Sequence, residues 1–155
     1  RETWKLVVTV MAHNNYVTAV AFDAKGIKML SGGEDHTIRI WRLPMRVAHR
    51  SPPVEVVRIQ NIQTTVLACD FTEAGTRVVG VLAGRQVYVW HATQGTPMCW
   101  WEFLPFDPDR YGSALWRTAL LSLTDALNSI IVTDSGGNTF TLALLGITPD
   151  DASKH

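Results

Sequence analysis

The sequence predicts an all-β chain built from a repeated antiparallel sheet. A pattern of phenylalanine, glycine and tryptophan recurs with a spacing of 49 residues, as Phe22, Gly26 and Trp41 and then as Phe71, Gly75 and Trp90. The runs around these residues are short, rich in β-branched and aromatic side chains, and separated by turn-forming residues. Self-similarity at such a period indicates a repeat architecture.

The first unit is a three-stranded meander that ends at Trp41. The runs from Val17 to Phe22 and from Ile27 to Leu30 have strand composition, and the segment from Asp23 to Gly26 between them suits a tight turn. Residues 31–36 are expected to reverse the chain again, because they contain two glycines and an aspartate. Residues 37–41 then alternate as a third strand.

Four residues occupy set places on this meander: His13, Ser31, Asp35 and Trp41. The intervals are 22 residues from histidine to aspartate, 4 from serine to aspartate and 6 from aspartate to tryptophan. This arrangement resembles a WD repeat, the blade of a β-propeller, in which such residues form a hydrogen-bonded tetrad. The serine, histidine and aspartate have the residue types of a catalytic triad, but a structural role is favoured. A buried tryptophan needs an acceptor for its indole N–H, and a chain of hydrogen bonds from tryptophan to serine to histidine to aspartate supplies one and satisfies every polar group.

The resemblance implies a fragment of a propeller, with three four-stranded antiparallel blade units in an arc over residues 1–146. The expected repeats span residues 13–43, 62–92 and 116–145. In this family the outer strand of a blade precedes the next repeat, so outer strands are expected at residues 3–11, 54–59 and 98–103. Residues 147–155 are expected to form a flexible tail.

The later units keep fewer of the tetrad residues. Ile62, Gly80 and Gly84 stand where the second unit would carry its histidine, serine and aspartate. In the third unit, the stretch from Ala119 to Leu127 has helix-like composition. Repeat context nevertheless favours strand, turn and strand there.

Composition narrows the classes of partner. Fourteen basic and fourteen acidic residues give no net charge, which removes the general electrostatic argument for nucleic acid or an anionic membrane as the main partner. Cys69 and Cys99 are too few for a disulfide framework or a zinc site, so an intracellular protein, nuclear or cytoplasmic, is expected. No cofactor or metal site is predicted, and no run of 18 apolar residues suggests a membrane span.

Three units are fewer than the four to eight blades of a propeller. The sheet faces at the two ends of the arc must therefore be covered. The favoured cover is the rest of a longer polypeptide; a second copy forming a six-bladed ring, or a partner protein, is the alternative. Residues 42–53, which are rich in proline and arginine, are expected to form a solvated insertion rather than a docking loop for an acidic partner.

The resemblance implies a non-enzymatic scaffold that binds proteins or peptides within a multi-protein complex. Its loops between strands would present the binding residues. The candidates are Asn14, Asn15, Tyr16, Glu34, Thr64, Thr65, Tyr111, Trp116 and Arg117. An enzyme framed on a propeller is the disfavoured alternative, because the sequence offers no metal triad, phosphate loop or paired carboxylates on facing strands.

A second alternative comes from five aromatic residues: Trp100, Trp101, Phe106, Tyr111 and Trp116. Aromatic walls can hold a quaternary ammonium group through cation–π attraction. The segments DHTIRIWRL and FDPDRYGSALWR are faintly similar to the WD-repeat subunits of the Polycomb repressive complex, the embryonic ectoderm development family, which bind methylated lysine with an aromatic pair. Trp116 matches one member of that pair, but Arg117 replaces the other. Packing in the core or between blades is favoured for Trp100, Trp101 and Phe106.

Overall fold

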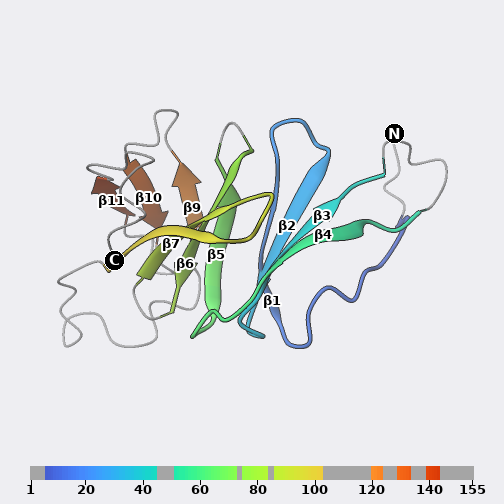
Figure 1. The fold of residues 1–155 in the computed structure, drawn as a ribbon, viewed down its shortest axis with the longest axis horizontal. Coiled ribbons are helices and arrows are strands. Elements are labelled where there is room, and N and C mark those ends of the chain that lie inside the picture. Colours follow the sequence, from blue (N-terminus) through green and yellow to red (C-terminus); the bar gives the residue numbers. More distant parts are fainter. Residues whose placement is uncertain are drawn as a thin grey trace.

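The computed structural model describes residues 6–44, 51–72, 75–83, 86–102, 120–123, 129–133 and 139–143, and its regular elements there are all strands (Figure 1). Sheet 1 contains β1 (Val17–Phe22), β2 (Lys28–Gly33), β3 (Ile38–Arg42) and β4 (Val54–Ile59). Sheet 2 contains β5 (Val66–Phe71), β6 (Arg77–Leu82), β7 (Gln86–His91) and β8 (Pro97–Glu102). Sheet 3 contains β9 (Leu120–Leu123), β10 (Ser129–Thr133) and β11 (Thr139–Ala143). Among these residues, no helix has the length and apolar character needed to span a bilayer.

Sheets 1 and 2 repeat the same local structure. The first turn of each contains a glycine with φ +64°, Gly26 in sheet 1 and Gly75 in sheet 2. The Gly26 amide donates to the Asp23 carbonyl at 2.9 Å, and the Gly75 amide donates to the Thr72 carbonyl at 2.7 Å. Because this left-handed conformation costs glycine little, the glycine spacing in the sequence marks a true structural period.

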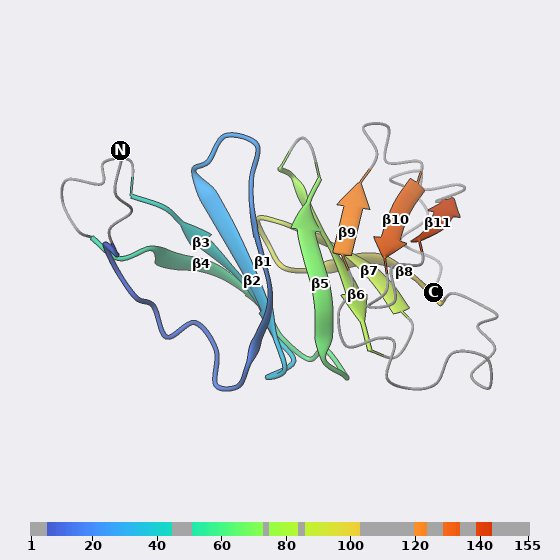
Figure 2. The same ribbon diagram turned by 180° about the vertical axis from the view of Figure 1, so that it is seen from behind.

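The three sheets stand side by side, with their first strands adjacent (Figures 1 and 2). Strands β1 and β2 pack against β5, and β5 packs against β9. The Thr18 hydroxyl on β1 lies between the Val66 carbonyl on β5 and the Gly32 carbonyl on β2, and can donate to either one. This side chain therefore links sheet 1 to sheet 2.

The core fills the space between sheets 1 and 2. Strand alternation turns Ile38 and Ile40 of β3 toward sheet 2, and Arg39 and Trp41 toward the opposite face. Sheet 1 contributes Leu30, Ile38, Ile40 and Ile59, and sheet 2 contributes Val66, Cys69, Phe71, Val78, Leu82 and Trp90. This burial fixes which face of each strand is available for a polar site.

The observed strands confirm most of the predicted order and correct some bounds. Strands β1 and β4 have the predicted limits, and β9 confirms strand rather than helix within residues 119–127. Strand β2 runs on to Gly33, so residues 31–33 are not part of the turn. They continue the ladder because Gly32 pairs with Ile38 on β3. Sheets 1 and 2 confirm the four-stranded expectation, and the described residues of sheet 3 form three strands, as expected for a last unit whose outer strand lies beyond it.

The outer strand expected over residues 3–11 does not form in residues 6–11. As the outer strand of a blade that precedes the first repeat, it would pair with that blade, and the described residues contain no strand before β1 to pair with it. Leu6 and Met11 are instead strongly exposed. Residues 3–5 and the expected tail at 147–155 lie outside the described residues.

Candidate functional site

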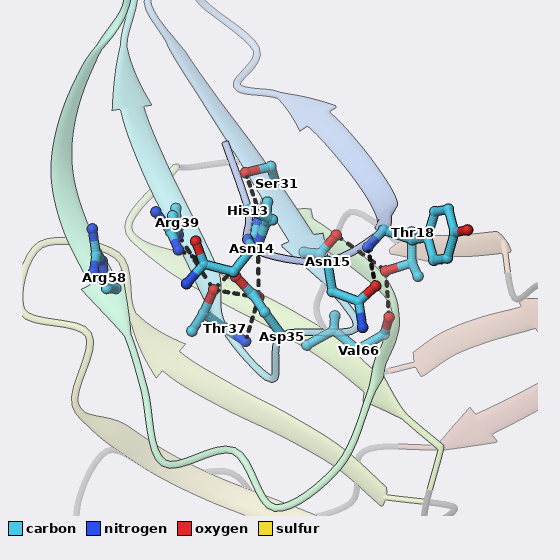
Figure 3. A network of polar contacts seen from close by, with 12 residues as sticks. His13, Asn14, Asn15, Thr18, Ser31, Asp35, Thr37, Arg39, Arg58 and Val66 are labelled. Atoms are coloured by element: carbon cyan, nitrogen blue, oxygen red, sulfur yellow. Dashed lines mark hydrogen bonds and ion pairs between the residues drawn. The ribbon is translucent and has the colours of Figure 1, made fainter. Parts of the chain in front are cut away.

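His13 is the centre of a buried polar network in sheet 1 (Figure 3). Its Nδ1 lies 2.8 Å from Asp35 Oδ1, and its Nε2 lies 2.8 Å from Ser31 Oγ. Because a carboxylate only accepts, Nδ1 carries the proton and Nε2 accepts from the Ser31 hydroxyl. Trp41 Nε1 donates to the same hydroxyl oxygen at 3.0 Å.

Local backbone structure brings these side chains together from three segments. Ser31 lies on β2, Trp41 lies on β3, and Asp35 lies in the turn between them. In that turn His36 adopts φ +61°, a left-handed conformation that histidine tolerates better than most residues. A Cβ on Gly33 would lie 2.8 Å from His13 Nδ1, so glycine is needed there for the imidazole ring to fit.

Two further residues join the network beyond the predicted four. Asp35 Oδ1 accepts from the Thr37 hydroxyl at 2.7 Å, and Asp35 Oδ2 accepts from Arg39 Nη2 at 3.2 Å. Arg39 also donates to Glu55 on β4 at 3.3 Å. The signal for Arg39 was present in the sequence, since strand alternation puts it on the same face of β3 as Trp41.

The hydrogen bonds that Asp35 accepts stabilise the ionised form of its carboxyl group. Burial alone would raise the pKa of its carboxyl group. The hydrogen bonds from His13, from Thr37 and from the Asn14 amide outweigh burial and hold the pKa well below its ordinary value of 3.8. Asp35 is therefore ionised at neutral pH, as a paired and nearly buried anion.

The geometry leaves the Ser31 hydroxyl without access to a substrate. Ser31 is 1% exposed, and its oxygen is already bonded to His13 and Trp41. A nucleophile must reach its substrate, and this one is enclosed. Within the part of the chain that the structure describes, no three histidine, cysteine or acidic residues come together as a metal site.

Stability is expected to fall in acid because the folded pKa of Asp35 is depressed. A depressed pKa adds stability that is fully present above the unfolded pKa, about 3.9, and is lost as pH falls through the folded value. Urea unfolding of the wild type should therefore show a free energy that declines progressively below about pH 5. The Asp35→Asn variant should show a smaller decline, and an equal decline in both proteins would contradict this assignment.

The loop residues predicted in the first unit gather at one end of sheet 1. Asn14, Asn15, Tyr16 and Glu34 are all exposed there. The Tyr16 amide donates to Asn15 Oδ1 at 2.8 Å, and the Glu34 amide donates to the Tyr16 carbonyl at 2.9 Å. The backbone of Tyr16 is therefore fixed while its side chain is 75% exposed.

The second unit repeats this end of the sheet with less exposure. The Ala83 amide donates to the Thr65 carbonyl at 3.0 Å, as the Glu34 amide does to the Tyr16 carbonyl. Thr64 and Thr65 are half-buried. In place of a tetrad, Trp90 covers Gly80, where a Cβ would lie 2.8 Å from the indole ring.

The aromatic cluster is described only in part. Trp100 stacks on Tyr88, with ring centroids 5.8 Å apart, but it is 51% exposed and is therefore not a core residue. Phe106, Tyr111, Trp116 and Arg117 lie outside the described residues, and only the backbone of Trp101 is described. The methyl-lysine interpretation depends on Trp116 and Arg117, so it stays a prediction.

Comparison with known proteins agrees with the geometry. Residues 4–42 match the family model of the WD domain, G-beta repeat. The THO complex subunit 6 homolog of Mus musculus is 27% identical over 100 residues, covering 62% of this chain and 28% of the relative. The DDB1- and CUL4-associated factor 13 of Dictyostelium discoideum is 29% identical over 90 residues, covering 58% of this chain and 20% of the relative. The chain thus spans less than a third of the length of these relatives, and its first unit, over residues 4–42, is similar to a WD repeat.

Proposed function

We propose that the chain is part of a β-propeller that acts as a non-enzymatic scaffold for protein or peptide partners. The proposal is carried by the closed network of His13, Ser31, Asp35 and Trp41, in which the serine, histidine and aspartate bond to one another and to the indole and not to a substrate. The exposed end of sheet 1 around Tyr16 is therefore the surface that we expect to bind a partner. Sheets 1 to 3 would be consecutive blades, with repeats within residues 1–146.

The names of the relatives support a role within a larger assembly. One relative is named as a subunit of a complex, and another as a factor associated with two other proteins. We extend only this general property to the present chain. An intracellular location, nuclear or cytoplasmic, stays a prediction that rests on two cysteines, both unpaired in the structure.

The uncovered face of β1 supports the proposal that further blades complete the ring. Val20 and Phe22 on this strand are 54% and 59% exposed, and neighbouring exposed apolar side chains of this size are typical of a surface that another part of the assembly covers. We propose that the remainder of a longer polypeptide covers them. Sedimentation of the chain alone should show a self-associated species such as a dimer, and a sharply melting monomer at dilute concentration would contradict the proposal.

Partner binding is expected to depend on the exposed end of sheet 1. Aromatic anchors carry much of the energy of protein interfaces, so Tyr16→Ala should weaken binding by about 2 kcal/mol. Trp116→Ala, in the corresponding segment of the third unit, should have a similar effect. The measurement is quantitative affinity purification of the tagged chain, followed by a titration of the recovered partner.

The matched control is Lys25→Ala, in the turn at the other end of β1. Lys25 is exposed, and its replacement should leave partner recovery unchanged. If Tyr16→Ala and Trp116→Ala retained every partner that the wild type recovers, binding through this end of the sheets would be wrong.

A further inference from the structure

A groove outside the polar network lies between sheet 1 and the turn that follows β7. It has a volume of about 370 Å³, which is within the range of ligand-binding sites. Its apolar lining includes Ile40 of β3, Val56 and Val57 of β4, and Ala92 after β7. The groove is therefore built by two consecutive repeats together, at the end of the sheets away from Tyr16.

Two cations lie directly opposite each other in this groove. Lys28 on β2 pairs in register with Arg42 on β3, and both line the groove. Strand alternation puts them on the same face as Leu30 and Ile40, which is the face turned toward sheet 2. Like charges in directly opposed positions destabilise a sheet. Repulsion between Lys28 and Arg42 therefore destabilises the folded state locally. An anion bound in the groove would offset this repulsion.

Nothing acidic among the described residues lining the groove neutralises this pair. The nearest carboxylate along the chain is Asp23, and its Oδ1 accepts from the backbone amides of Ile27 and Lys28, each at 2.8 Å. Asp23 therefore stabilises the turn between β1 and β2. Neither Lys28 nor Arg42 forms an ion pair with another described residue.

We propose that this groove binds a partner segment in which a large apolar side chain stands next to aspartate or glutamate. The apolar lining would bury the side chain, and Lys28 and Arg42 would pair with the carboxylates. The proposal rests on the scaffold function and adds a second recognition surface, with a stated ligand chemistry. Charge complementarity selects an acidic segment over a neutral or basic one.

The test begins with a randomised dodecapeptide phage library selected on the immobilised full chain. Enriched peptides are then synthesised with a fluorescein label and titrated by anisotropy. We expect them to combine an aromatic or branched apolar residue with neighbouring acidic residues. Lys28→Glu and Arg42→Glu should each weaken binding by about tenfold, and Lys25→Glu should change it by less than about twofold because Lys25 does not line the groove.

Thermal unfolding of the same variants separates a binding role from a structural one. Lys28→Glu replaces a like-charge pair by an opposite-charge pair across β2 and β3, so its melting temperature should match or exceed that of the wild type. Binding and stability should therefore change in opposite directions. A variant that loses both together would mean that Lys28 merely supports the fold, and would overturn the proposal.

The selection also distinguishes this proposal from the scaffold function itself. Enriched peptides without acidic residues, or peptides that keep their affinity in Lys28→Glu but lose it in Tyr16→Ala, would overturn the groove and leave the scaffold standing. If no peptide is enriched and no partner is recovered with the tagged chain, both proposals are wrong.

Discussion

Replacing Asp35 by alanine is expected to destabilise the protein by about 3 kcal/mol. The change removes the acceptor of His13, Thr37, Arg39 and the Asn14 amide in one step. The Arg39 guanidinium is nearly buried, and it would keep only Glu55 as a charged partner. Urea unfolding at pH 7 measures the loss, because the carboxylate is fully ionised there.

The control is Glu34→Ala, at the neighbouring turn position. Glu34 is exposed, so its replacement should change the free energy of unfolding by no more than about 0.5 kcal/mol.

The milder variants Asp35→Asn and Trp41→Phe should each lower the free energy of unfolding by roughly 1–3 kcal/mol, because each leaves a buried donor or acceptor unpaired. If an Asp35 variant removed a biochemical activity but left stability unchanged, the structural role of the network would be wrong.

The parts of the fold predicted from sequence are those in which local and repeated signals agree. Gly26 and Gly75 mark equivalent turns because each must adopt a positive φ, and that requirement is visible in composition alone. Strand β9 was predicted against its own helix-like composition, because the repeat gave a stronger constraint than propensity. The spacing of His13, Ser31 and Asp35 likewise predicted which side chains would meet.

The parts that were missed depend on contacts between segments. Whether residues 6–11 form a strand depends on a preceding blade with which they could pair, and no local pattern encodes its presence. Strand β2 extends through Gly32, at a point where β5 of sheet 2 approaches the backbone closely. Strand alternation indicates the face on which Arg39 lies, but its pairing with Asp35 and Glu55 depends on how the turn and β4 are placed.

That close approach predicts the second large effect, which is the cost of a side chain at Gly32. A Cβ there would lie 2.6 Å from Val66 Cγ1 and 3.0 Å from Cys69 Sγ, both on β5. Val66 is fully buried, so it has no free space into which it can move. Gly32→Val should force sheets 1 and 2 apart and destabilise the protein by about 3 kcal/mol, measured by urea unfolding.

A second substitution tests whether this cost comes from the contact between the sheets. Val66→Ala removes the carbon nearest to the new side chain, so in the Gly32→Val background it should cost less than it does alone, or should recover stability. The coupling energy of this double-mutant cycle should be about 1 kcal/mol or more in favour of the double variant. Additive effects would mean that residue 32 does not limit how closely β2 approaches β5, and that glycine is needed there only for the backbone of β2.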